Sequence, residues 1–442
     1  MSLFDKKTEN NNRNRTIKRS SVQNQYISEL VEHYKTRILK ETNLELLTSL
    51  PQGEMRLRIE QLISQFMSEE KIILPRHDKE LLITRIIDES IGYGPLEPLL
   101  NDPSITEILI NNFNEIYIEQ YGKLQLSPIS FRDESHVRHV IDRIVAPLGR
   151  RIDDSSPMVD ARLPDGSRVN AVIPPISLGG SVVSIRKFRK EPFRIQDLLN
   201  FESLNENMSR FLDAIVRAKM NVLISGGTGS GKTTLLNVLG DSIPVGERII
   251  TIEDSAELRL DKPNVVGLEA RPENMEGEGE ISIRHLVKNS LRMRPDRIIV
   301  GEVRGSEAFD MLQAMNTGHE GSITTVHANT PFDALRRVEG MVVMAGMDLP
   351  SHIVREYIVG ALDIIVQSTR LTDGTRKIVS ICEVYRSESG EINIDEIFTY
   401  RRKGLKENGQ VEGSFEPTGK IPKCLEKIKM YGIELDEEIF KG

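Results

Sequence analysis

Cysteine is nearly missing from this 442-residue chain, which contains only Cys382 and Cys424. Two cysteines without the spacing of paired metal ligands exclude a disulfide framework and a cysteine-based zinc site. Long apolar runs are missing as well, since no stretch approaches the roughly 20 residues that cross a bilayer. The amino-terminal residues lack the apolar core of a signal peptide. We therefore expect a cytoplasmic protein whose membrane contact comes through a partner.

An excess of positive charge is also absent. The formal net charge is −8, which argues against a protein whose main task is coating nucleic acid, and no nucleic-acid partner is expected. An apolar share of 38% and a charged share of 28% are typical of a soluble protein with adequate cores. The length predicts two to four domains.

The most specific pattern in the chain is a phosphate loop of the form G-x-x-x-x-G-K-[ST]. Its residues are Gly226, Gly227, Thr228, Gly229, Ser230, Gly231, Lys232, Thr233 and Thr234. Glycines allow the backbone N–H groups to point inward at phosphate oxygens. Lys232 supplies a cation to the β and γ phosphates, and the Thr233 hydroxyl is suited to Mg²⁺. Residues 221–224 are typical of a buried strand and residues 234–239 of a helix, so the loop has its required context, and we expect ATP and Mg²⁺ to bind here.

Polar side chains follow three more apolar segments, as expected at the carboxyl ends of parallel strands. Glu253 ends the first segment, with Glu257 close behind, and Glu302 follows the second. Gly301 occupies the position where a Walker B strand usually ends in Asp, so Glu302 is the residue expected to position water or hold Mg²⁺. His327 ends the third segment and is a candidate sensor of the γ-phosphate.

Composition and periodicity divide the chain into five parts. The predicted parts are a disordered basic tail (1–21), a helical amino-terminal domain (22–90), an α+β domain (91–190), a linker (191–203) and an α/β nucleotide-binding domain with a helical tail (204–442). Residues 271–280 are polar and glycine-bearing, which indicates a loop.

Two arginines of the α+β domain are candidates for the same site. Arg168 follows a turn and Arg186 lies in an apolar segment. Added cations at the γ-phosphate favour phosphoryl transfer, so one reading is that both reach a nucleotide bound by the next domain or subunit. The other reading is that both are solvent-facing strand residues.

These patterns resemble the type II/IV secretion ATPases. The phosphate loop, residues 251–258, residues 292–304 and residues 317–329 resemble the Walker A, Asp, atypical Walker B and His boxes of that family. His319 lies within the last of these boxes. Residues 94–99, 156–168 and 185–188 are most similar to the tight-adherence (CpaF/TadA) branch. The resemblance runs from about residue 80 to the carboxyl terminus.

The resemblance implies a RecA-like carboxyl-terminal domain, a PAS-like domain before it and a homohexameric ring. It implies that an inner-membrane platform protein is a partner and that pilin is handled indirectly. It also implies that ATP hydrolysis drives pilus assembly, and it leaves open whether the same motor drives retraction. It assigns phosphate and Mg²⁺ to Lys232 and Thr233, and polarisation of water to Glu253 or Glu257. The choice of catalytic base between Glu253 and Glu302 stays open, and His319 is expected to contact nucleotide.

Three other functions compete with a pilus motor. A type IV secretion traffic ATPase that moves protein or DNA shares the same boxes. A small-molecule kinase with a phosphate loop needs a lid domain with an acceptor site, which the sequence does not indicate. A nucleotide-gated scaffold would bind ATP without turnover, and intact Glu253 and Glu302 argue against it.

Overall fold

The computed structural model describes residues 26–27, 29–38, 40–42, 52–188, 192–273, 278–346, 349–387 and 392–441. The predicted basic tail lies outside these residues. The chain divides into two compact units, residues 1–189 and 190–442. Within the described part of the chain, none of the helices combines the length and the hydropathy that a bilayer crossing requires.

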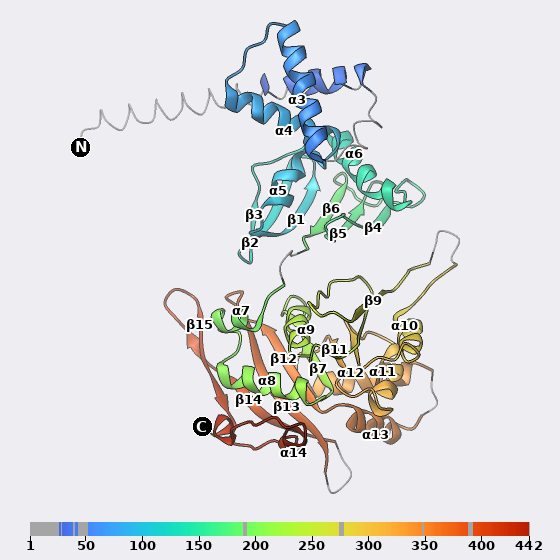
Figure 1. The fold of residues 1–442 in the computed structure, drawn as a ribbon, viewed down its shortest axis with the longest axis vertical. Coiled ribbons are helices and arrows are strands. Elements are labelled where there is room, and N and C mark those ends of the chain that lie inside the picture. Colours follow the sequence, from blue (N-terminus) through green and yellow to red (C-terminus); the bar gives the residue numbers. More distant parts are fainter. Residues whose placement is uncertain are drawn as a thin grey trace, which may run out of the picture. The chain divides into compact units, whose positions relative to one another are not determined.

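The first unit begins with helices that pack around a small apolar core (Figure 1). Residues 29–38 are helical, followed by α3 (Gln52–Glu69) and α4 (Arg76–Ser90). Apolar residues recur at helical spacing, so each helix turns one apolar face inward. Tyr34, Ile63 and Phe66 are among the most deeply buried of these side chains.

An antiparallel six-stranded sheet follows in the same unit, in the order β3-β2-β1-β6-β5-β4. Its strands are β1 (Ile105–Asn112), β2 (Glu115–Gln120), β3 (Lys123–Leu126), β4 (Met158–Arg162), β5 (Arg168–Val172) and β6 (Val182–Arg186). The short helices η1 (Gly94–Leu96) and α5 (Glu97–Asn101) precede it. Helix α6 (Glu134–Val145), whose amino terminus is capped by Asp133, is followed by η2 (Ala146–Leu148). Strand β4 was not predicted.

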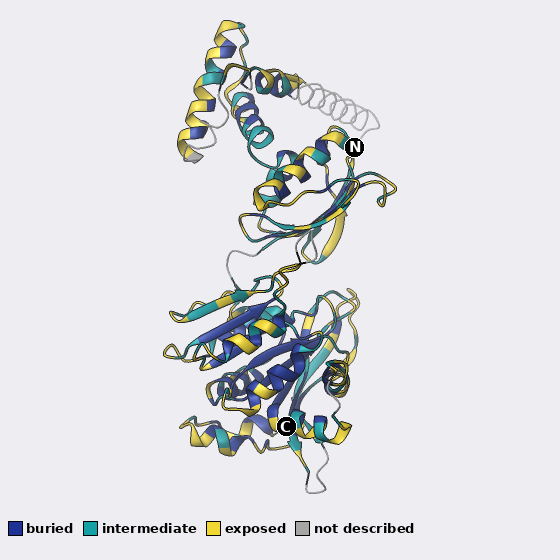
Figure 2. Cartoon of the chain, turned by 90° about the vertical axis from the view of Figure 1, so that its right-hand side faces the viewer, coloured by how far each residue is buried: buried dark blue, intermediate teal, exposed yellow. Residues whose placement is uncertain are grey.

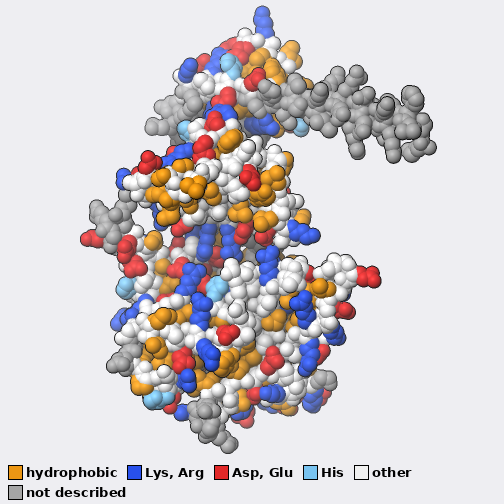
Figure 3. Space-filling view, turned by 180° about the vertical axis from the view of Figure 1, so that it is seen from behind, with side chains coloured by type: hydrophobic (Ala, Val, Ile, Leu, Met, Phe, Trp, Pro, Cys, Tyr) orange, Lys and Arg blue, Asp and Glu red, His pale blue; other side chains and the backbone are white. Residues whose placement is uncertain are grey.

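Alternation along these strands separates a buried face from an open face. Val169, Ile185 and Ile108 point into the core together with the apolar residues of α6. Both edge strands expose apolar side chains: Leu124 and Leu126 of β3 are 61% exposed, and Met158 of β4 is 60% exposed. Figure 3 shows apolar side chains gathered over this domain.

The second unit is built on a nine-stranded sheet in the order β15-β14-β13-β12-β7-β11-β10-β8-β9. Its parallel part contains β7 (Val222–Gly226), β8 (Ile249–Glu253), β9 (Val265–Glu269), β10 (Arg297–Val300), β11 (Ile323–Val326) and β12 (Ile364–Arg370). Strands β7, β8, β10 and β11 are buried throughout, because helices cover both faces (Figure 2). This layered parallel sheet confirms the predicted α/β class.

Two helical layers cover the sheet. One apolar core contains α8 (Glu206–Arg217), α9 (Lys232–Asp241) and α14 (Leu425–Met430). The other contains α10 (Ile283–Ser290), α11 (Glu307–Asn316), α12 (Pro331–Met344) and α13 (Ser351–Ala361). Successive side chains of β7 point to opposite faces of the sheet, so Val222 and Ile224 belong to the first core and Leu223 belongs to the second. Helix α7 (Ile195–Asn200) precedes α8, and η3 (Glu437–Phe440) closes the unit.

An antiparallel extension follows β12, in the region where the sequence predicted a helical tail. It consists of β13 (Arg376–Arg386), β14 (Ile392–Leu405) and β15 (Val411–Pro417). The sequence did not predict β14 and β15, because their many polar residues lack the alternation of apolar and polar side chains that indicates a strand. They pair with each other and reach the sheet only through β13, so exposed side chains are tolerated along them.

Candidate functional site

The polar residues predicted at strand ends meet where β7, β10 and β11 end and α9 begins (Figure 1). Parallel pairing aligns the ends: Ser225 of β7 pairs with Val326 of β11, and Val300 of β10 pairs with Thr324 of β11. Glu302 and His327 therefore leave neighbouring strands at the same edge of the sheet as the phosphate loop.

The phosphate loop has a backbone that only glycine adopts easily. Gly229 and Gly231 have φ values of +70° and +95°. Gly226 is also sterically constrained, since a methyl group there would lie 2.4 Å from both Oγ of Ser230 and the carbonyl oxygen of Ser368. The loop thus turns tightly into the amino terminus of α9, the arrangement that presents backbone N–H groups to an anion. Its shape suits the phosphates of ATP.

Lys232, His327 and Glu302 form a continuous polar chain above this loop. Nζ of Lys232 donates to the carbonyl oxygens of Gly226 (3.1 Å) and Gly227 (3.0 Å) and lies 3.3 Å from Nε2 of His327. The same imidazole nitrogen lies 3.0 Å from Oε1 of Glu302. Burial and the nearby Lys232 ammonium lower the pKa of His327. The imidazole nitrogen thus lies between the Lys232 ammonium and the Glu302 carboxylate.

Arg304 extends the chain beyond Glu302, a contact that the sequence did not predict. Nη2 of Arg304 donates to Oε2 of Glu302 at 2.6 Å, and Nη1 lies 3.6 Å from Asp254. The hydrogen bond to Glu302 raises the pKa of Arg304. Both carboxylate oxygens of Glu302 therefore have a neighbour that fixes their direction. The sequence signal that could have indicated this contact is a basic residue two positions after a carboxylate at the end of a strand.

Glu253 explains why Gly301 replaces the usual aspartate. The Glu253 carboxylate is buried and accepts hydrogen bonds from the backbone N–H groups of Glu257 (2.9 Å) and Leu258 (3.1 Å). A methyl group on Gly301 would lie 2.9 Å from Cγ of Glu253. Glu253 therefore occupies the space that an aspartate side chain at position 301 would need. Glu257 is connected to the site through its backbone N–H, which orients Glu253.

Magnesium has two candidate protein ligands at this edge. Thr233 lies in the first turn of α9, and Glu302 lies at the end of β10. Hydroxyl and carboxylate oxygens suit Mg²⁺, which usually keeps several waters and takes phosphate oxygens as further ligands. The donor set fits the ion, and bound Mg²⁺ would neutralise charge on the phosphates.

Buried Gln367 of β12 supports the segment that carries His327. Its Nε2 donates to the carbonyl oxygens of Ala328 (3.2 Å) and Asn329 (3.1 Å). This contact joins residues from distant parts of the chain, and the sequence did not indicate it. It restrains the backbone directly after His327.

His319 is not brought into this cluster. It lies in the turn between α11 and β11, at the amino end of β11, whereas the phosphate loop lies at the carboxyl end of the neighbouring strands. Its carbonyl oxygen accepts from Oγ of Ser322, and its N–H donates to Ala314. A contact between His319 and nucleotide therefore stays a prediction, because box membership in sequence does not determine which end of a strand a residue occupies.

In the first unit, Arg168 and Arg186 belong to a row of arginines on the open face of the sheet. Arg168 pairs across β5 and β6 with Arg186, and across β4 and β5 with Arg162. Paired residues of adjacent strands point to the same face. The sequence missed Arg162 because strand β4 itself was not predicted. Arg186 also pairs with Glu107 of β1, so the row contains three guanidinium groups and one carboxylate. Its net positive charge attracts an anion.

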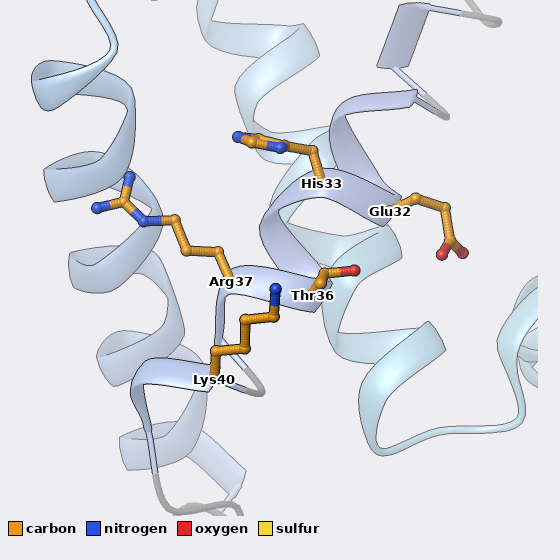
Figure 4. A pocket seen from close by; sticks show the side chains of 5 residues that line it. All are labelled: Glu32, His33, Thr36, Arg37 and Lys40. Atoms are coloured by element: carbon orange, nitrogen blue, oxygen red, sulfur yellow. The ribbon is translucent and has the colours of Figure 1, made fainter.

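An open pocket of about 430 Å³ lies in the helical part of the first unit (Figure 4). Its lining residues are Glu32, His33, Thr36, Arg37 and Lys40. Arg37 already pairs with Glu41, Glu69 and Glu70. None of the predicted site residues lines this pocket.

Comparisons with known proteins agree with the motifs. The family model described as type II/IV secretion system protein matches residues 89–414. A putative conjugal transfer protein of Mycobacterium tuberculosis is 37% identical over 306 residues, which are 68% of this chain and 86% of that protein. The type IV secretion system protein VirB11 of Bartonella quintana is 33% identical over 326 residues, covering 65% of this chain and 90% of that protein.

A solved structure of the VirB11 ATPase from the Brucella suis type IV secretion system, in complex with sulphate, is also similar. It is 30% identical and covers 65% of this chain and 95% of that one, with a TM-score of 0.36. The family assignment rests on the sequence matches, which include the phosphate loop and the strand-end residues. The chain belongs to the type II/IV secretion system protein family and is an ATPase.

Proposed function

We propose that this protein is a motor in which ATP hydrolysis powers a pilus or secretion machine. The observation that carries the proposal is the convergence of Lys232, His327 and Glu302 beside the phosphate loop, with distances of 3.3 Å and 3.0 Å between successive side chains. Phosphoryl transfer needs positioning and charge stabilisation more than covalent chemistry, and this cluster supplies both.

We assign each residue a role on its chemistry. Lys232 binds the β and γ phosphates after leaving the carbonyl oxygens of its own loop, and Thr233 holds Mg²⁺. Glu302, next to His327 in the polar chain, orients the attacking water, and His327 links Glu302 to Lys232. Glu253 is the weaker candidate for the base, because its carboxylate is buried and accepts two backbone hydrogen bonds.

We further propose that the arginine row supplies the remaining positive charge. In this proposal, the α+β unit acts as the PAS-like domain of the family, and Arg162, Arg168 and Arg186 approach the triphosphate in the assembled motor. The pairing of these arginines on three adjacent strands supports a shared role in binding one polyanion.

The proposed assembly is a homohexameric ring. A ring joins two different surfaces of neighbouring copies, so each copy needs two complementary patches. The sheet of the first unit exposes apolar side chains at both of its edges, Leu124 and Leu126 on β3 and Met158 on β4. Apolar patches of this kind are typical of protein–protein contacts. The proposed location is the cytoplasmic face of the inner membrane, reached through a membrane platform protein.

Two machines are candidates for the work that the motor performs. The segments 94–99, 156–168 and 185–188 favour a tight-adherence pilus. The relatives named as conjugal transfer and VirB11 proteins favour a type IV secretion traffic ATPase. We propose the pilus motor first, because those segments distinguish branches within the family, whereas the four ATPase boxes do not.

Phosphate release by purified protein tests the activity. We expect Lys232→Ala to lose nucleotide binding. Glu302→Gln should keep ATP binding and lose turnover by about 100-fold or more, since it retains shape but not charge. Glu320→Gln is the matched control, because Glu320 lies at the amino end of β11, away from the phosphate loop, and pairs with Lys427. Wild-type turnover in Glu302→Gln would contradict the role of Glu302.

A gene deletion in the source cell distinguishes the two machines. Complementation with wild-type protein, but not with Glu302→Gln, should restore pili on the cell surface if the motor assembles a pilus. Restoration of DNA or protein transfer with no change in piliation would instead support the traffic ATPase.

A further inference from the structure

The hairpin formed by β12 and β13 lies directly against the phosphate loop. Arg370, the last residue of β12, pairs across the hairpin with Arg376, the first residue of β13. Hydrogen bonds close its turn: the N–H of Leu371 donates to the carbonyl oxygen of Thr375, and the Asp373 carboxylate accepts from Thr375 and from the N–H of Val411 on β15. The two arginines thus flank a turn that is held by hydrogen bonds.

Two side chains of this hairpin bind carbonyl oxygens of the phosphate loop. Nε of Arg376 donates to the carbonyl oxygen of Gly229 at 2.8 Å. Oγ of buried Ser368, on β12, donates to the carbonyl oxygen of Ser230 at 2.6 Å. The donors come from strands about 140 residues further along the chain than the loop.

These contacts determine which way the loop N–H groups point. In a trans peptide, the carbonyl and the N–H of one unit point in opposite directions. Holding the carbonyl of Gly229 outward directs the N–H of Ser230 into the loop, where it lies 3.3 Å from Gly227 O. Holding the carbonyl of Ser230 directs the N–H of Gly231 inward in the same way. Inward N–H groups are the phosphate-binding groups of such a loop.

The two guanidinium groups also lie at the solvent-facing side of the loop. Both arginines are exposed. A methyl group on Gly229 would be 3.7 Å from Nη1 of Arg370, and one on Gly231 would be 3.4 Å from Cδ of Arg376. Arginine stays charged at all physiological pH values and forms strong hydrogen bonds with phosphate.

We propose that Arg370 and Arg376 form a cationic subsite beside the phosphate loop, provided by the same chain, whose positive charge favours binding of the polyphosphate of ADP and ATP. Arg376 has a second role as a positioning residue, because it orients the peptide that follows Gly229. The subsite also connects nucleotide binding to the antiparallel extension, since Asp373 of the hairpin turn is bonded to β15. The proposal rests on the phosphate loop as the nucleotide site.

Titration of a fluorescent ADP analogue into the full chain tests the subsite. Arg376→Ala should weaken binding by about tenfold, the loss expected for a charge-assisted hydrogen bond. Arg370→Ala should weaken binding less, by about threefold, because loss of Arg376 also removes the hydrogen bond to Gly229, whereas the charge of an exposed guanidinium is screened by solvent. Arg376→Lys should recover only part of the loss, since lysine lacks the planar donor group.

Arg386→Ala is the matched control, because Arg386 is an exposed arginine at the other end of β13, bound to Glu356. It should bind the analogue as the wild type does. In steady-state ATP hydrolysis, Arg376→Ala should raise KM far more than it lowers kcat, a split that general destabilisation does not produce. Arg376→Lys provides a second measurement if Arg376→Ala fails to fold.

Wild-type affinity in both Arg370→Ala and Arg376→Ala would overturn the subsite, as would an equal loss in Arg386→Ala. Absence of binding by the wild-type chain would instead overturn the assignment of the phosphate loop itself. The two failures are therefore distinguishable.

Discussion

Nε2 of His327 lies 3.0 Å from Oε1 of Glu302, so the imidazole connects the strand-end carboxylate to the phosphate-loop lysine. The ammonium of Lys232 is 3.3 Å from the same nitrogen. One ring nitrogen thus faces a cation and an anion. Entry of a phosphate would change the position of Lys232 and thereby the surroundings of His327, which is the arrangement that a γ-phosphate sensor needs.

Replacing His327 tests this relationship. We expect His327→Ala to lower kcat by about 10-fold to 100-fold, because Glu302 loses one of the two groups that orient it. The melting temperature should change little, since the imidazole is partly exposed. His352→Ala, an exposed histidine on α13, is the control. An unchanged kcat in His327→Ala would show that Glu302 does not depend on the imidazole.

Replacing Gly301 with aspartate, the residue that Walker B strands usually contain at this position, tests the packing of Glu253 against Gly301. Gly301→Asp should reduce both stability and turnover, because its side chain would displace Glu253. Overpacking of this kind costs about 1–3 kcal/mol. Gly340→Ala, in α12, is the control, as a methyl group there has no neighbour within 4 Å. Denaturant unfolding and phosphate release provide the two readouts, and full activity in Gly301→Asp would contradict the steric explanation.

The arginine row predicts losses of turnover without losses of folding. Arg162→Ala, Arg168→Ala and Arg186→Ala should each lower kcat by at least about tenfold, because charge on the transferred phosphoryl group is stabilised less. Arg151→Ala is the control, since Arg151 is exposed in the same unit and pairs with Asp153. Melting temperatures that fall in step with activity would indicate a structural role instead.

Asp88 predicts a pH dependence of stability in the first unit. Burial, which is the largest cause, and the negative charges of nearby Glu97 and Glu89 raise the pKa of Asp88 to about 6. Because this pKa exceeds the value near 3.9 of an unfolded chain, ionisation favours the unfolded state, and stability falls as pH rises from about 4 to 6. Asp88→Asn should therefore stabilise the protein at pH 8 by about 1–2 kcal/mol, after a discount for partial exposure.

The expected gain in Asp88→Asn is smaller at pH 5, where part of the native population already holds the proton. Asp142→Asn, an exposed carboxylate on α6, should change the free energy of unfolding by less than about 0.5 kcal/mol at either pH. Thermal unfolding at pH 5 and pH 8 measures both variants. An equal gain at the two pH values would contradict the assignment to Asp88.

The sequence alone determined the features that depend on neighbouring residues. The phosphate loop, the acidic residues at the ends of β8 and β10, and His327 at the end of β11 could all be predicted, because motif spacing and buried apolar runs are local. The α/β class followed from the same runs. Strands β4, β14 and β15 could not be predicted, because their polar side chains hide the two-residue period that marks a half-buried strand.

Only the tertiary structure decided how distant segments complete the phosphate loop. Pairing of β12 with β7 brings Ser368, Arg370 and Arg376 to the loop, and pairing of β4 with β5 places Arg162 beside Arg168. Strand direction placed His319 at the amino end of β11 and His327 at the carboxyl end, although both belong to one box in the sequence. Register and strand direction depend on packing between segments far apart in the chain, which motif spacing does not report.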